Sequence, residues 1–324
     1  MKKSDRRRIR VRFAILAVLL LIGILLDINA GYSGAGLQDL FAGNPILVQF
    51  RLPRVLVSLL VGIALSLSGS IMQSVTGNDM AEPGLLGINA GAGLFIALFI
   101  FLFRQGSPAF TLMLPLLAFA GSVLTFFTEY RLASSRGRVH PKRLLLMGVA
   151  ISIALTSLTT VIMLKLPDSQ YAFVQNWIAG NIWGADWNGV LLLTAGVLLL
   201  FLYVFFKSRT LNGLMLGHDV ATGIGIDTRK ESRNLLLAAV GLSSLCCAVG
   251  GGMSFVGLVA PHLARKLVGP NYVRLLPAAV LVGAVMLVFA DLVSRTCFLP
   301  FEMPIGIVTA VLGAPYFLYL LIRE

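Results

Sequence analysis

The chain has 324 residues, of which 57% are hydrophobic, with 26 basic and 14 acidic side chains and a mean hydropathy of +0.89. These values exclude an ordinary soluble domain, a collagen, a disulfide scaffold and a disordered tail. Because a bilayer core about 30 Å thick requires roughly 20 apolar residues per helix, this composition supplies about nine or ten spans. We therefore predict an all-α polytopic membrane protein with a single transmembrane domain, 1-324.

The net charge of +12 does not indicate a nucleic acid partner, because the basic residues form short clusters between apolar runs. The three cysteines show no Cys-x-x-Cys spacing, and the three histidines are scattered without the spacing of metal ligands. We expect no nucleic acid binding, no redox role for the cysteines and no metal site.

Apolar runs between charged residues and turn formers predict ten membrane-spanning helices. Their approximate ranges are 13-28, 52-73, 85-103, 110-130, 143-164, 190-206, 235-250, 254-268, 275-294 and 304-322. The glycines at 250-252 mark either a turn between two shorter helices or a break within one. The basic head 1-12 and the apolar run after it also resemble a signal peptide. An uncleaved first helix fits the later charge distribution better, since cleavage would leave nine spans and demand the opposite charge bias.

The distribution of basic residues predicts the orientation of the chain. Ten crossings place most of them on one side of the membrane, in the head, the loops 131-143 and 265-274, the segment 207-233 and the tail. The other side holds only Arg51, Arg54, Arg104, Lys165 and Arg295. The positive-inside rule then predicts that both termini are cytoplasmic.

The predicted spans contain few ionisable residues near their centres, where channels and proton-coupled carriers usually place them. Glu129, Lys165 and Asp291 lie near span ends, where snorkelling or ion pairing accounts for them. The chain also has no G-x-x-x-x-G-K-[ST] phosphate loop, so we do not expect it to hold ATP in that manner. A separate energy-supplying partner is expected.

The longest predicted cytoplasmic connection, 207-233, contains two short apolar turns separated by a glycine. The residues of interest are Leu211, Leu214, Leu216, Gly217, Asp219, Ala221 and Gly225. Asp219 suits a helix N-cap, and Gly225 suits a C-terminal stop. Two short amphipathic helices here would offer an apolar knob to a soluble partner. A loop folded against its own bundle fits the same spacing.

A series of motifs carries a resemblance to a known family through its order and spacing. The motifs are Arg51-Leu52-Pro53-Arg54, Ser68-Gly69 with Gln73, Ala81-Glu82-Pro83-Gly84-Leu85-Leu86-Gly87, Trp177-Ile178-Ala179-Gly180, Leu216-Gly217, Phe255 to His262, Ala290-Asp291 with Arg295, Pro304 to Ala310 and Gly313-Ala314-Pro315. Over nearly its whole length the chain resembles the FecCD-type permeases, the membrane subunits of bacterial ABC importers for iron-siderophores, haem and cobalamin. One departure is Asp79, at a position where relatives commonly have proline.

The resemblance implies a type II ABC importer permease fold of ten helices that works as a homodimer, or as a heterodimer with a paralogue. It assigns the segment from Leu211 to Gly225 to coupling helices that sit in a cleft of the ATPase subunit. It also implies that Arg51, Arg54 and Arg295 receive acidic residues of an extracytoplasmic substrate-binding protein. Arginine suits this role because its fork pairs bidentately with carboxylates. Asp291 could instead satisfy Arg295 within one helix.

We therefore expect a non-catalytic subunit of the bacterial cytoplasmic membrane that moves an iron-siderophore complex, or else haem or cobalamin, by alternating access. Its partners would be ATPase subunits that hold ATP and Mg, the binding protein, a second permease copy and membrane lipid, while the chain itself binds no cofactor. Ser66, Met72 and Thr309 are candidates for the translocation path. The rival functions are an ion-coupled carrier acting alone and an intramembrane enzyme.

Overall fold

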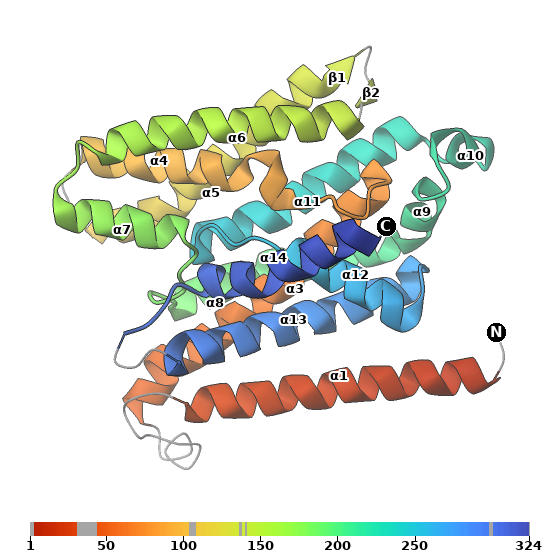
Figure 1. Cartoon of the computed structure of the whole chain (residues 1–324), viewed down its shortest axis with the longest axis horizontal. Coiled ribbons are helices and arrows are strands. Elements are labelled where there is room, and N and C mark those ends of the chain that lie inside the picture. The colour runs from red at the N-terminus through yellow and green to blue at the C-terminus, as the bar shows by residue number, and fades with distance from the viewer. Residues whose placement is uncertain are drawn as a thin grey trace.

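The computed structural model of the chain describes residues 3–30, 44–103, 108–135, 138–139, 141–297 and 301–323. These residues form a bundle of long helices that run side by side (Figure 1). In chain order the helices are α1 (Lys3–Asn29), the π-helical turn η1 (Leu47–Arg51), α3 (Leu52–Thr76), the 3-10 turn η2 (Pro83–Leu86), α4 (Ile88–Leu102), α5 (Pro108–Ala133), α6 (Pro141–Met163), α7 (Asp168–Ile178), α8 (Trp187–Phe206), α9 (Ser208–Leu214), α10 (His218–Gly223), α11 (Thr228–Gly250), α12 (Val256–Val268), α13 (Tyr272–Thr296) and α14 (Ile305–Arg323). Among the described residues, strand pairing is confined to β1 (Ser134–Ser135) and β2 (Arg138–Val139), which are antiparallel.

Helices occupy all ten ranges in which spans were expected, but their lengths differ. Eight stretches of described residues are long and apolar enough to cross a membrane. Helix α4 has 15 residues and α12 has 13. At 1.5 Å per residue they rise only about 22 Å and about 20 Å, which is less than the roughly 30 Å of a bilayer core. The helical membrane architecture is confirmed, whereas ten full crossings stay a prediction.

Helix α3 forms the centre of the bundle and packs against α13, α11, α12 and α8. Glycine allows the closest of these approaches. A methyl group on Gly62 would overlap the carbonyl of Gly283 in α13, and one on Gly69 would overlap Gly257 in α12. Small residues have this role because lipid supplies no hydrophobic force that drives helices together, so close backbone packing must hold them.

The glycine-rich stretch after α11 is a turn between two helices. Helix α11 ends at Gly250, Gly251 takes a φ of 71°, and α12 begins at Val256. The backbone N–H of Phe255 donates to the buried carboxylate of Glu82, which precedes η2. Irregular backbone at membrane depth is tolerated where protein covers it. The geometry of this turn therefore depends on Glu82, which lies 173 positions away in the sequence.

The two ends of the bundle carry different elements. Both chain termini lie at the same end as α9 and α10, which we call the terminal end (Figure 1). The opposite end, where α1 ends and α3 begins, carries Arg51, Arg54 and Arg295, and we call it the arginine end. Helix α1 lies at the edge of the bundle against α13. Termini at one end agree with an even number of crossings; which side of the membrane they occupy stays a prediction.

Candidate functional site

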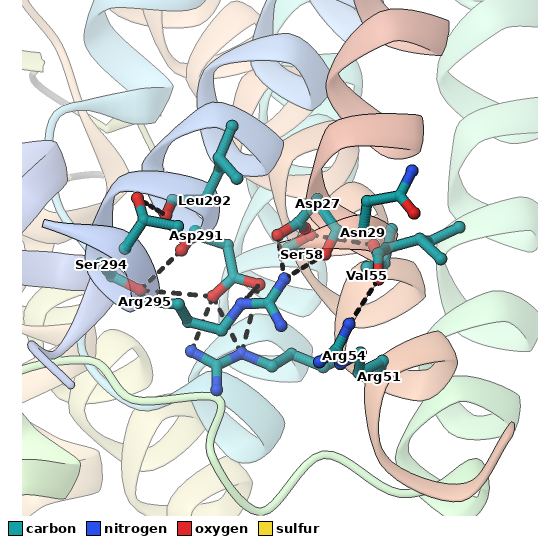
Figure 2. A network of polar contacts seen from close by, with 12 residues as sticks. Asp27, Asn29, Arg51, Arg54, Val55, Ser58, Asp291, Leu292, Ser294 and Arg295 are labelled. Carbon is teal, nitrogen blue, oxygen red and sulfur yellow. Dashed lines mark hydrogen bonds and ion pairs between the residues drawn. The ribbon is translucent and has the colours of Figure 1, made fainter. Parts of the chain in front are cut away.

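The three arginines with a predicted docking role come together at the arginine end. Arg51 is the last residue of η1, Arg54 lies in the first turn of α3, and Arg295 lies in the last turn of α13. All three side chains are buried, although a docking role suggests an accessible surface. The chain's own acidic and carbonyl groups surround them (Figure 2).

Arg54 contacts two carboxylates at once. Its Nε donates to Asp291 at 2.9 Å, its Nη2 lies 2.8 Å from the same carboxylate, and its Nη1 donates to Glu302 at 2.7 Å. The Asp291 side chain is fully buried, whereas 35% of the Glu302 side chain is exposed. A buried two-point pair is strong, and a partly exposed single contact contributes little. Glu302 is therefore the partner that Arg54 loses most easily.

Arg295 connects α13 to α1. Its Nη2 donates to the carboxylate and the carbonyl of Asp27, and its Nε lies 3.7 Å from Asp291. Arg51 donates from Nη1 to the carbonyl of Ile28 at 2.8 Å. The sequence suggested that Asp291 and Arg295 pair within one helix, and this pair exists. Its contact is longer than the contact of Asp291 with Arg54 and that of Arg295 with Asp27.

Sequence reasoning missed Asp27 and Glu302. A signal for Asp27 was present, because an acidic residue at the end of a long apolar run requires a partner. No local pattern points to Glu302, which reaches Arg54 across 248 positions of sequence. With both included, three arginines face three carboxylates, and the formal charges at the arginine end cancel.

At the terminal end, α9 and α10 fold partly against the bundle. Leu211, Leu214 and Ala221 belong to its main hydrophobic core. The hydroxyl of Ser74 in α3 donates to the carbonyl of Leu211 at 2.9 Å, which fixes α9 to the central helix. These predicted coupling residues therefore anchor the segment and do not present themselves to a partner.

The outward face of the same segment is apolar. Leu216, Val220 and Ile224 are 61%, 51% and 61% exposed, and we call these three residues the apolar knob. The segment 207-233 thus folds against its own bundle with one face and exposes apolar side chains on the other, and contact with a partner stays a prediction. The exposed area is the kind of surface that an apolar groove of a partner covers.

Glycines bound α10 on both sides. Gly217 and Gly225 take φ values of 94° and 86°, which favour glycine. Gly225 follows the helix end as predicted. The prediction for Asp219 was wrong: Gly217 occupies the N-cap position, and Asp219 lies in the first turn of α10. A negative charge at this position still interacts favourably with the positive end of the helix dipole.

The chain's own helices enclose the candidate path residues. Ser66 donates to the carbonyl of Ile63 at 2.8 Å, Thr309 donates to that of Gly306 at 2.9 Å, and Met72 is fully buried. In this conformation none of the three candidates faces an outer surface of the chain. Their role in the path stays a prediction.

Two further acidic residues depart from the sequence-based expectations. Glu129 is fully buried, and neither of its carboxylate oxygens has a hydrogen-bond partner among the described residues, so neither snorkelling nor pairing accounts for it. Asp79, at the position where proline was expected, accepts from Arg265 and ties the turn after α3 to α12.

Within the described ranges, no group of three or more His, Cys, Asp and Glu residues could hold a metal ion.

Comparisons with known proteins find similarity to one transport family over nearly the full chain. The FecCD transport family matches residues 10–323. The iron(3+)-hydroxamate import system permease protein FhuG of Bacillus subtilis is 44% identical over 283 residues, which are 86% of this chain and 84% of that protein. The Fe(3+) dicitrate transport system permease protein FecD of Escherichia coli is 38% identical over 89% of each chain. The hemin transport system permease protein HmuU of Yersinia pestis is 36% identical over 99% of this chain and 98% of its own.

A solved structure has the same fold. It is a metal-chelate type ABC transporter in an inward-facing conformation, with a TM-score of 0.85 and 26% identity over 98% of this chain and 100% of that chain. The family match includes both the arginine end and the apolar knob. The chain therefore belongs to the FecCD transport family and is a multi-pass permease subunit of the bacterial inner membrane.

Proposed function

We propose that this chain is the permease of an ABC importer that carries an iron-siderophore complex across the membrane by alternating access. The observation that carries the proposal is the family match over residues 10–323. The matched residues include both the arginine end and the apolar knob, which belong to one helical bundle. The names of relatives specify iron(3+)-hydroxamate, Fe(3+) dicitrate and hemin, so a ferric chelate is the favoured cargo class.

The terminal end would face the cytoplasm and an ATPase subunit. Its basic loops satisfy the positive-inside rule in that orientation. The apolar knob would seat in a cleft of the ATPase, while Leu211, Leu214 and Ala221 transmit its displacement to the bundle. ATP and Mg would be held by that partner. The chain would supply a two-state element whose equilibrium is biased from both faces of the membrane.

The arginine end would dock the substrate-binding protein by exchanging carboxylates. Because the three arginines are already neutralised, an incoming acidic residue must displace an internal one. Glu302 is the partly exposed partner of Arg54, and Asp291 is fully buried. A carboxylate of the binding protein would therefore replace Glu302 on Arg54, while Asp291 keeps the guanidinium in place.

A second permease copy would complete the path. Helices α6 and α14 expose large apolar side chains, among them Leu146, Ile153, Val311 and Leu312. Such faces suit either lipid or the same helices of a second copy. The path would then run between two copies, identical or paralogous.

Opposite effects of two substitutions test the docking. Arg54→Gln should weaken association with the substrate-binding protein of this importer by roughly tenfold, since a charge-assisted contact to the incoming carboxylate is lost. Glu302→Gln should strengthen it, by up to about fivefold, because a partly exposed ion pair contributes as much as about 1 kcal/mol. Association would be measured by surface plasmon resonance on the full chain with its ATPase in nanodiscs.

The control is Lys165→Gln, which removes an exposed charge that belongs to no ion pair among the described residues. It should leave association unchanged. A misfolded variant could only weaken binding, so the gain from Glu302→Gln carries the test. Equal affinity of both variants and the parent would remove the docking proposal.

A further inference from the structure

A cavity of about 430 Å³ lies at the terminal end, between the last turn of α5 and the first turns of α11. Its lining residues are Tyr130, Ser134, Asp227, Arg229, Lys230 and Arg233. The volume falls within the roughly 300 to 1,000 Å³ of ligand pockets. Neither the docking nor the coupling proposed above uses this cavity.

Positive charge exceeds negative charge in the cavity, where three basic side chains stand beside one carboxylate, Asp227. Arg229, Lys230 and Arg233 are exposed, and none of them belongs to an ion pair among the described residues. Asp227 uses a carboxylate oxygen to cap α11 by accepting from the backbone N–H of Lys230 at 3.0 Å. The N-terminus of a helix already carries partial positive charge, and the nearby Glu231 is paired with Lys207, so the excess of basic side chains there favours a further anion.

A hydroxyl group in the wall of the cavity also lacks a partner. Ser134 Oγ is shielded from solvent, and it has no hydrogen-bond partner among the described residues. A serine hydroxyl can donate to a phosphate oxygen. The cavity thus gathers three cationic side chains, which is the chemistry that recognises a phosphate group, and rotation of the Ser134 side chain would add a donor.

The surface beside the cavity is apolar on both helices. Phe127 lies one turn before Tyr130 on α5, Leu237 lies one turn after Arg233 on α11, and both are exposed. Residues three and four apart share a helix face. At the level of the cavity α5 therefore changes from Phe127 to the polar-tipped Tyr130, and α11 changes from Leu237 to the basic Arg233, as expected at the boundary between acyl chains and headgroups.

We propose that the cavity binds the phosphate headgroup of an anionic phospholipid of the cytoplasmic leaflet, whose acyl chains lie against Phe127 and Leu237. Basic pockets between membrane helices on the cytoplasmic side suit such headgroups. A free phosphate ion would satisfy the basic residues but would leave the apolar surface uncovered. This lipid site rests on one part of the proposed function, the placement of the terminal end in the cytoplasm. It does not depend on which cargo the permease carries or on its ATPase partner.

Native mass spectrometry of the delipidated full chain in detergent tests this site, with phosphatidylglycerol, phosphatidylethanolamine and inorganic phosphate as probes. The parent chain should retain one phosphatidylglycerol much more tightly than phosphatidylethanolamine. The triple variant Arg229→Gln, Lys230→Gln, Arg233→Gln should bind phosphatidylglycerol roughly a hundredfold more weakly, since each surface cation contributes about a factor of five. The control replaces the three exposed arginines at 6–8 by glutamine, which removes equal charge from the basic head. It should keep the tightly bound lipid.

Two further measurements separate the possible occupants. Phe127→Ser should weaken phosphatidylglycerol binding and leave inorganic phosphate binding unchanged. If Phe127→Ser has no effect and phosphate competes fully with lipid, the occupant is free phosphate and the lipid proposal is wrong. It is also wrong if the triple variant keeps its lipid but loses the ATPase subunit, because the site then serves a protein. Failure of ATP-driven import would leave these binding results unchanged, so the two proposals fail separately.

Discussion

Asp27 is the residue that joins the first helix to the rest of the bundle by charge. Its side chain is fully buried and pairs with Arg295, which is itself buried. Helix α1 has few other buried side chains, since only 17% of its membrane window is buried within the chain. The buried pair therefore holds α1 at its far end together with the packing of Ile28 against Leu47 and Val55.

Asp27→Asn should lower the free energy of unfolding by about 3 kcal/mol, because it leaves Arg295 buried without its charged partner. The measurement is unfolding of the purified chain by SDS titration in mixed micelles. The matched control is Asp168→Asn on the exposed first turn of α7, which should change stability by less than about 0.5 kcal/mol. Equal stabilities of the two variants would mean that the pair with Arg295 contributes nothing to the attachment of α1.

The residues of the arginine end could be predicted only in part. Arg51, Arg54 and Arg295 stand in recognisable motifs, and the structure brings them together. Their neutralisation by Asp27 and Glu302 depends on contacts across 268 and 248 positions of sequence, which no local pattern encodes. The sequence indicated which cations gather there but not how far the chain itself already satisfies them.

At the scale of elements, the segment that runs from α9 to α10 has one buried face and one exposed face. Leu211 packs in the core, and Leu216, five residues later, is mostly exposed. Substitutions of these two leucines can be compared directly, because the residue type and the segment are the same and only the exposure of the side chain differs. Only the exposed one is free to contact a partner.

Leu216→Asp should abolish co-purification of the ATPase subunit and leave the stability of the permease nearly unchanged, because a charge would enter the apolar contact. Leu211→Ala should instead lower the stability of the permease by about 2 to 5 kcal/mol, as core truncations of leucine do. Pull-down of the ATPase and SDS titration measure the two effects. Loss of stability from Leu216→Asp with the ATPase still bound would contradict this division of tasks.

Helix positions were predicted well from the sequence, and helix ends were not. The span expected at 235-250 belongs to α11, which begins seven residues earlier at Thr228. Hydropathy indicates which residues suit lipid, whereas a helix extends over every residue whose backbone hydrogen bonds are satisfied. Helix α11 therefore starts directly after its N-cap, Asp227, before the apolar run begins. Helix α7 was missed for the same reason, since its apolar residues are too few and interspersed with polar ones.

For the whole molecule, the arginine end and the segment of α9 both connect to one central helix. Arg54 lies in the first turn of α3, and the α9 contact through Ser74 lies near the other end of that helix. Because α3 is in close glycine contact with α12 and α13, a displacement at either end moves packed neighbours as a unit. This continuity gives a physical route by which docking on one side and ATPase motion on the other bias the same two states.

In the function proposed above, the chain is a gate without its own energy source. The direct test is uptake of a labelled ferric siderophore into vesicles, with the purified chain alone or with its ATPase and binding protein. We expect accumulation against a gradient only with both partners and ATP, and none from the chain alone under an imposed proton gradient or membrane potential. Uphill uptake by the chain alone, lost when Glu129 is replaced by glutamine, would contradict the account and identify an ion-coupled carrier.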